Sequence, residues 1–114
     1  MKGQPLAKRL GFAADGLLLA LRRESSFRLQ ALAGAAVFVA LLLIRPSALW
    51  WAIVALAVGL VWVAELFNTV IELLSDHLHP EIHPQIRAVK DIAAGAVLVA
   101  SLVALLVAVA LLLR

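Results

Sequence analysis

The sequence predicts an all-α membrane protein, in which one amphipathic surface helix precedes three transmembrane helices in a single domain, residues 1–114. The chain is 65% hydrophobic, and its apolar residues gather in three blocks at roughly 29–44, 49–74 and 92–113. An α-helix needs about 20 residues to cross the hydrocarbon core of a bilayer. The third block contains Ser101 as its one polar residue, which excludes the amphipathic helix of a soluble bundle.

The surface helix is predicted over residues 5–27. Charged residues interrupt its apolar residues at five positions before Glu24: Lys8, Arg9, Asp15, Arg22 and Arg23. Such a composition suits a helix that lies in the membrane interface with its basic side chains toward the headgroups. A solvated lead-in to the first span is the alternative. Glu24 and Arg28 are four residues apart, the spacing of an ion pair on one helix face.

The three spans are predicted over residues 29–45, 49–75 and 91–113. The turn after the first span contains Pro46, which cannot continue the preceding helix, and Trp50 follows as an aromatic residue typical of the membrane interface. The loop before the third span contains two prolines and three histidines. We expect this loop to be a connector between two antiparallel spans.

The basic residues predict the orientation in the membrane. Six of the ten precede the first span: Lys2, Lys8, Arg9, Arg22, Arg23 and Arg28. The positive-inside rule then places the N-terminus and the second loop in the cytoplasm. A cleavable signal peptide is disfavoured, because about 28 residues precede the first apolar block. Topology and anionic lipid explain the basic residues, so nucleic acid is not expected as a partner. The chain has no cysteine, which excludes disulfides.

The stretch AELFNTVIELLSDHLH, residues 64–79, carries ionisable groups in the second span and at its end. Four polar residues lie within roughly 60° of Glu65 around the helix axis: Asn68, Thr69, Glu72 and Asp76. An ionisable group at membrane depth costs a few kcal/mol. This polar stripe must therefore face protein, a ligand or a wet cleft rather than lipid.

Topology brings the polar stripe to the cytoplasmic boundary together with Glu24, Lys90 and Asp91. Carboxylates, an amide and a lysine suit a Mg²⁺-bound polyphosphate, and a carboxylate that reaches into the membrane suits the deprotonation of a lipid hydroxyl. The residues alone leave three interpretations open: catalysis, a proton or cation path, and a polar seam that packs helices. The three histidines beside Glu81 fit no standard zinc spacing, and a polar interfacial loop is the alternative to a metal site.

A family resemblance then narrows the choice. ELFNTVIELLSD, with E-x-x-N-T-x-I-E-x-x-x-D spacing, the KD pair at 90–91 and the RESSFR segment together resemble the prokaryotic diacylglycerol kinases over essentially the whole chain. The resemblance implies a homotrimer in the bacterial inner (cytoplasmic) membrane, with active sites built from more than one subunit. It also implies transfer of the γ-phosphate of MgATP to diacylglycerol, giving phosphatidic acid in phospholipid recycling. Undecaprenol is the alternative lipid alcohol.

The resemblance also implies a role for each candidate site residue. Glu65 is the catalytic base at the lipid hydroxyl, and Glu24 and Glu72 are the ligands of Mg²⁺ and bind the nucleotide through it. Four further residues match nucleotide-contacting positions: Glu81, His83, Lys90 and Asp91. Asn68 and Asp76 match supporting residues, while Phe27 and Arg28 border the lipid substrate. The chain departs from the family pattern at four positions: Pro5, Phe12, Asp15 and Gln30.

Overall fold

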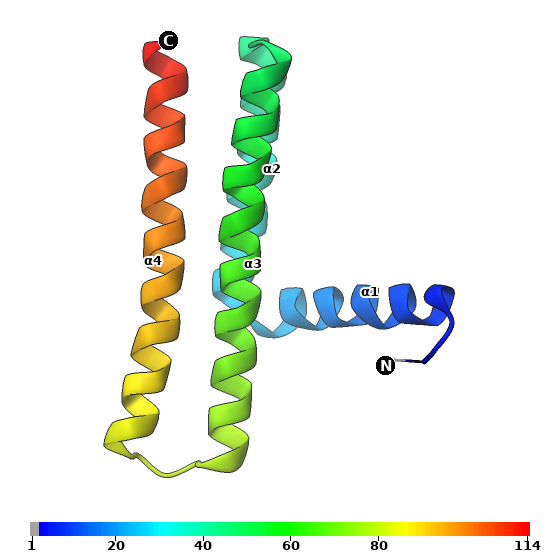
Figure 1. The fold of residues 1–114 in the computed structure, drawn as a ribbon, viewed down its shortest axis with the longest axis vertical. Coiled ribbons are helices and arrows are strands. Elements are labelled where there is room, and N and C mark those ends of the chain that lie inside the picture. The colour runs from blue at the N-terminus through cyan, green and yellow to red at the C-terminus, as the bar shows by residue number, and fades with distance from the viewer. Residues whose placement is uncertain (1–2) are drawn as a thin grey trace.

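The computed structural model describes residues 3–114, and this part of the chain forms four α-helices. They are α1 (Leu6–Arg23), α2 (Ser25–Ile44), α3 (Ala48–Leu78) and α4 (Pro84–Leu113). Helices α2, α3 and α4 run side by side, whereas α1 projects sideways from them (Figure 1). The prediction of an all-helical chain is confirmed. Lys2, one of the basic residues used to predict the topology, lies outside the described residues.

Three of the helices are long and apolar enough to cross a membrane, as the sequence predicts. The 20 residues of α2 span about 30 Å, which matches the hydrocarbon thickness of a bilayer. The 31 residues of α3 and the 30 of α4 are longer by about 15 Å each. The surplus lies beyond the level at which α1 leaves the bundle (Figure 1). It carries the end of the polar stripe, which places those residues beyond the N-terminal end of α2.

A small apolar core joins the three long helices at the end away from α1. Leu41 of α2, Val54 of α3 and Leu111 of α4 are buried against one another. Phe38 and Trp51 pack edge to face, with their ring centroids 5.4 Å apart. Many large apolar side chains elsewhere on the three helices are exposed. Such surfaces suit contact with lipid or with other membrane helices.

The corner between α1 and α2 differs from the sequence prediction. The helix expected over residues 5–27 ends at Arg23, because Glu24 adopts extended backbone angles (φ −109°, ψ 110°). Arg28 Nη1 donates to the carbonyl oxygens of Leu21 and Arg22, at 2.9 Å each, and so caps the end of α1. The predicted ion pair between Glu24 and Arg28 is wrong: residues 3–114 contain no such pair. The Arg28 guanidinium donates to the end of α1 instead, so it does not pair with Glu24.

The two remaining turns have local causes. Arg45 ends α2 in the left-handed conformation (φ 57°), and Pro46 prevents the helix from continuing. Helix α3 runs to Leu78, three residues past the predicted end of the second span. Helix α4 begins at Pro84 rather than at residue 91. Proline is favoured in the first helical turn, and the His83 side chain accepts a hydrogen bond from the backbone N–H of Gln85.

Candidate functional site

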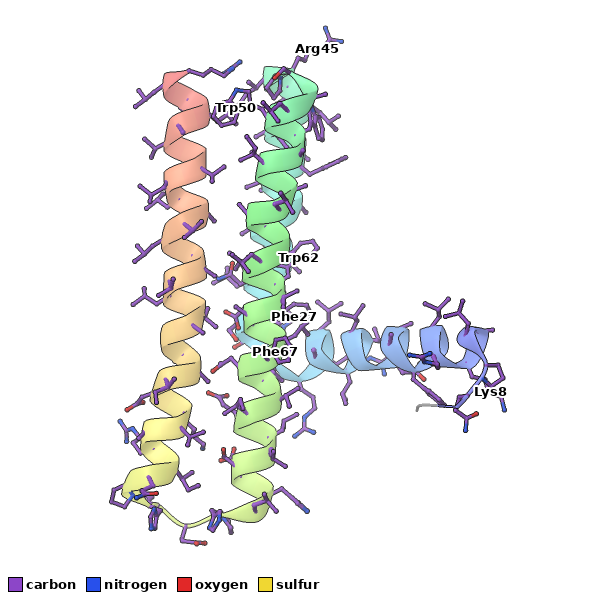
Figure 2. All side chains as sticks on the ribbon, in the orientation of Figure 1. Lys8, Phe27, Arg45, Trp50, Trp62 and Phe67 are labelled. Atoms are coloured by element: carbon purple, nitrogen blue, oxygen red, sulfur yellow. The ribbon has the colours of Figure 1, made fainter. Side chains whose placement is uncertain are left out.

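Glu65 is the one buried charged side chain of residues 3–114, with 4% of its surface exposed. Its Oε2 accepts a hydrogen bond of 3.2 Å from the Ser26 hydroxyl, in the first turn of α2. Thr69 Oγ1 donates to the backbone carbonyl oxygen of Glu65, at 3.0 Å. The contact with Ser26 places Glu65 at the level where α1 meets α2, which Figure 2 marks by the nearby Phe27 and Phe67.

The acidic residues divide into paired and unpaired groups. Three form ion pairs near the loop between α3 and α4: Asp76 with Lys90, Asp91 with Arg87 at 3.6 Å, and Glu81 with His79 at 3.4 Å. Within the described range, Asp15 on α1 has no ion-pair partner, and neither do Glu24, Glu65 and Glu72. These three glutamates are the residues to which the family resemblance assigns the proton and the metal. Their charges are thus available to a ligand rather than neutralised by the chain itself.

The polar stripe is split between two faces of α3. Thr69 lines an apolar cavity of about 470 Å³ between α1 and α3, together with Ala20 and Leu66. Asn68 instead lines an apolar groove of about 790 Å³ between α3 and α4. The Asn68 Oδ1 atom is buried and has no hydrogen-bond partner in the described part of the chain. A buried, unpaired amide oxygen is costly, so the groove holds an acceptor that a ligand or another helix would satisfy.

A polar cluster lies at the C-terminal end of α3 and in the loop that follows it. A pocket of about 160 Å³ is lined by Asp76 and by three of the predicted nucleotide-contacting residues: Glu81, His83 and Lys90. Asp91 is exposed and pairs with Arg87. Glu72 is half-buried and lies seven residues, about 10 Å, beyond Glu65 along α3. Asp76 lies about 16 Å from Glu65 along the same axis. One chain therefore presents the surroundings of Glu65 and the polar cluster around Asp76 as two separate groups.

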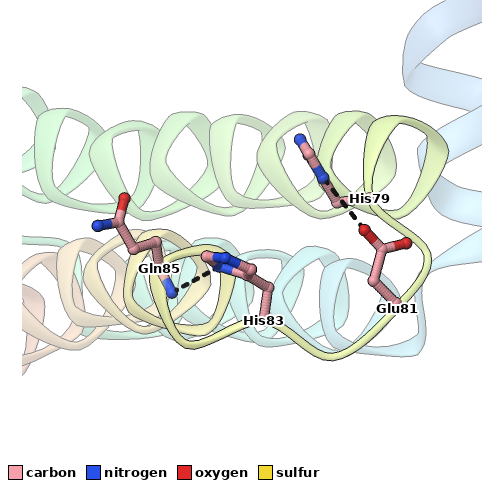
Figure 3. A network of polar contacts seen from close by, with 4 residues as sticks. All are labelled: His79, Glu81, His83 and Gln85. Carbon is pink, nitrogen blue, oxygen red and sulfur yellow. Dashed lines mark hydrogen bonds and ion pairs between the residues drawn. The ribbon is translucent and has the colours of Figure 1, made fainter.

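Local hydrogen bonds hold the loop between α3 and α4, through His79 and His83 (Figure 3). Between residues 3 and 114, no three His, Asp or Glu side chains lie close enough to hold a metal ion by themselves. His83 Nδ1 accepts the Gln85 N–H at 3.1 Å. The backbone N–H of Glu81, followed by the His79 ring, holds the pKa of the Glu81 carboxyl below its usual value of about 4.5. These contacts fit the polar interfacial loop that the sequence left as the alternative.

The two residues expected at the lipid border have structural contacts of their own. Phe27 is buried, with 4% of its surface exposed, at the start of α2. Arg28 is exposed, and its Nη1 atom bonds the end of α1. Both residues shape the corner beside Glu65.

Sequence reasoning missed the contacts that join α2 to α3 near Glu65. Ser26 was not a candidate, although a serine in the first turn of an apolar span is itself a signal. Trp62 Nε1 donates to the carbonyl oxygen of Gln30 at 2.9 Å. The Trp62 ring lies over Gly34 so closely that a Cβ there would stand 2.4 Å from Cζ2. Glycine thus lets the two helices approach one turn from the buried carboxylate.

Comparison with known proteins adds independent information. The family model described as prokaryotic diacylglycerol kinase matches residues 11–112. A Bacillus subtilis protein named undecaprenol kinase is 35% identical over 95 residues, which cover 83% of this chain and 77% of the relative. A Synechocystis protein named diacylglycerol kinase is 36% identical over 103 residues, which cover 90% of this chain and 59% of the relative. The chain therefore matches somewhat more than half of the length of the second relative.

Proposed function

This chain belongs to the prokaryotic diacylglycerol kinase family, and we propose that it phosphorylates the hydroxyl of a membrane lipid alcohol, with Glu65 as the general base. Membership of this family supports the activity of an ATP-dependent lipid kinase. The three long apolar helices support a multi-pass membrane protein. The resemblance seen in the sequence is confirmed by the family match. The roles of single residues, the lipid and the oligomeric state are proposals.

The environment of Glu65 carries the assignment of the base. The carboxylate is buried beside the corner of α1 and α2, and one oxygen is held by Ser26. No side chain of residues 3–114 donates a hydrogen bond to the second oxygen. A general base must lie within hydrogen-bond reach of the proton that it takes. The lipid hydroxyl gives its proton to this oxygen, and the lipid oxygen attacks the γ-phosphate, with ADP as the leaving group.

The donor set fits magnesium. Glu24 and Glu72 are unpaired carboxylates in the described part of the chain, and Mg²⁺ is usually held by one or two carboxylates with phosphate oxygens and water. We propose that these two residues hold the Mg²⁺ of MgATP, which offsets the charge on the transferred phosphoryl group. Asn68 and Asp76 support the site. Asp76 holds Lys90 in place through their ion pair.

The nucleotide is proposed to lie lengthwise along the projecting end of α3. Its phosphates would be near Glu65 and Glu72, and its far end near the pocket lined by Glu81, His83 and Lys90. Asp91 is the residue after Lys90 on α4, and we propose that it contacts the nucleotide in the same region. The separation of about 16 Å along α3 between the two clusters supports this extended placement.

The exposed apolar surface supports a homotrimer with composite sites. The groove between α3 and α4 contains the unpartnered Asn68 Oδ1, which a second subunit could complete. The charges support a bacterial inner membrane orientation with the active site in the cytoplasm. Lys8, on α1, lies toward the end of the molecule that contains Glu65, whereas Arg45 lies at the opposite end (Figure 2).

Diacylglycerol is the substrate we propose first, and undecaprenol second. The relative named undecaprenol kinase, of which the match covers the larger share, supports the second. Both lipids place a primary hydroxyl at the interface and a long apolar body in the membrane. The cavity between α1 and α3 would border that body, and Phe27 and Arg28 are proposed to border it at the corner.

The test is lipid-dependent ATP consumption by the purified protein in bilayers that contain diacylglycerol or undecaprenol. We expect phosphorylated lipid with MgATP, and Glu65→Gln should abolish turnover while leaving the oligomer intact. The conservative change keeps the side-chain shape, so loss of turnover reports the proton acceptor. Ion flux that depends on Glu65 without any use of ATP would refute the kinase assignment and support the transporter interpretation.

A further inference from the structure

We infer that Ser26 is the positioning residue of Glu65, and that Trp62 packed on Gly34 sets the helix spacing that lets the Ser26 hydroxyl reach the carboxylate. The inference rests on the proposed role of Glu65 as the base. It concerns how this chain orients that base.

Ser26 is the one side chain of residues 3–114 that donates to the Glu65 carboxylate. The two residues are 39 positions apart in the sequence and belong to different helices. A glutamate side chain has several staggered rotamers, and a hydrogen bond to one oxygen selects among them. With Oε2 held, the orientation of the other oxygen is defined. A hydroxyl does this without a positive charge, so the base is not tied up in an ion pair.

The contact between Ser26 and Glu65 is one of a regular series of contacts between α2 and α3. Ser26, Gln30 and Gly34 recur every four residues and share one face of α2. On the antiparallel α3, Glu65 meets Ser26, and Trp62, three residues earlier, meets Gln30 and Gly34. The Trp62 N–H bond to the Gln30 carbonyl fixes the sliding of one helix along the other. The ring over Gly34 fixes their separation.

Ser26 has no competing local role. A serine in the first turn of a helix commonly bonds nearby backbone groups. Here its hydroxyl bonds across to α3, and the N-cap position of α2 is Glu24, whose side chain makes no capping bond. The side chain is thus free to serve the neighbouring helix.

The experiment measures lipid phosphorylation by Ser26 variants of the full chain in bilayers. Ser26→Ala should lower kcat about tenfold, which is about 1.4 kcal/mol of activation free energy, with the KM for ATP unchanged. Ser26→Thr, which keeps the hydroxyl, should retain kcat within about threefold, a difference below 1 kcal/mol. Ser26→Val matches threonine in shape and should behave like alanine. If the alanine variant does not fold, the threonine and valine pair decides.

The neighbouring serine provides a matched control. Ser25→Ala should leave kcat unchanged, because no hydrogen bond from the Ser25 side chain occurs in the described range. Trp62→Phe keeps a packed ring but loses the N–H donor, so it should lower kcat in the wild type and have little further effect in Ser26→Ala. Equal effects of Trp62→Phe in the two backgrounds would overturn the role of the Trp62 N–H bond in setting the register that brings Ser26 to Glu65.

The outcomes separate this inference from the proposed function. An active wild type, an inactive Glu65→Gln and equal kcat across the Ser26 series would overturn the role of Ser26 alone. Equal loss in the threonine and valine variants would also overturn it, because the hydroxyl would then not be the cause. A wild type without lipid phosphorylation would overturn the proposed function, and this inference with it.

Discussion

Gly34→Ala tests the tight contact between α2 and α3 at Gly34 and Trp62. A Cβ at this position would stand 2.4 Å from Trp62 Cζ2 and 3.0 Å from Val58 Cγ1. Both distances are shorter than a relaxed carbon contact, which lies near 3.5–4.0 Å. The Trp62 ring must move, and its movement strains the hydrogen bond to the Gln30 carbonyl. We expect α2 and α3 to be pushed apart at the level just above Glu65.

Two costs and one gain determine the change in the free energy of unfolding. Overpacking a tight contact costs about 1–3 kcal/mol, and a weakened hydrogen bond about 0.5–1.5 kcal/mol. Replacing glycine by alanine inside a helix returns about 1 kcal/mol of helix propensity. The net expectation is a loss of about 0.5–3.5 kcal/mol in the free energy of unfolding.

The assay is reversible unfolding of the protein in detergent micelles, followed by circular dichroism. Gly59→Ala is the matched control, because it also lies in a spanning helix and its new Cβ meets nothing within 4 Å. We expect the control to be neutral or more stable by up to about 1 kcal/mol. If Gly34→Ala is as stable as Gly59→Ala, the tight approach of α2 and α3, and the register built on it, would be refuted.

Three further predictions concern the corner, the ion pair and the loop. Arg28→Ala removes two hydrogen bonds from the exposed end of α1 and should destabilise that end of the helix by roughly 1 kcal/mol. The change should be seen as faster amide exchange near Leu21. Arg9→Ala, the control, should leave exchange there unchanged. Asp76→Asn should change stability by less than about 1 kcal/mol, because the pair with Lys90 is largely exposed, but it should raise the KM for ATP; an unchanged KM would argue against a nucleotide role for Lys90. The lowered pKa of Glu81 means that its stabilising contribution is complete above the usual value of about 4.5 and disappears as the pH falls through the lower folded-state value. In an NMR titration, His79→Ala should move the pKa of Glu81 only part of the way back, since the bond to its own backbone N–H remains.

The apolar blocks and the helical period were sufficient to predict the spanning helices and the polar stripe. Hydropathy over about 20 residues is a property of composition, and the angular positions of Glu65 and Glu72 on α3 follow from its regular geometry. The boundaries were less predictable. The sequence predicts Pro84 in a connector, yet it opens α4, because proline is as compatible with the first turn of a helix as with a loop.

The sequence by itself determined that the chain is helical, that three helices can cross a membrane, and that carboxylates gather toward one end of the second. The tertiary structure decided which of those carboxylates are paired, which one is buried, and what holds it. Ser26 reaches Glu65 across 39 residues, and Arg28 bonds the end of α1 instead of Glu24. These contacts depend on the register and separation of two helices, which the packing of Trp62 on Gly34 sets and which no local pattern encodes.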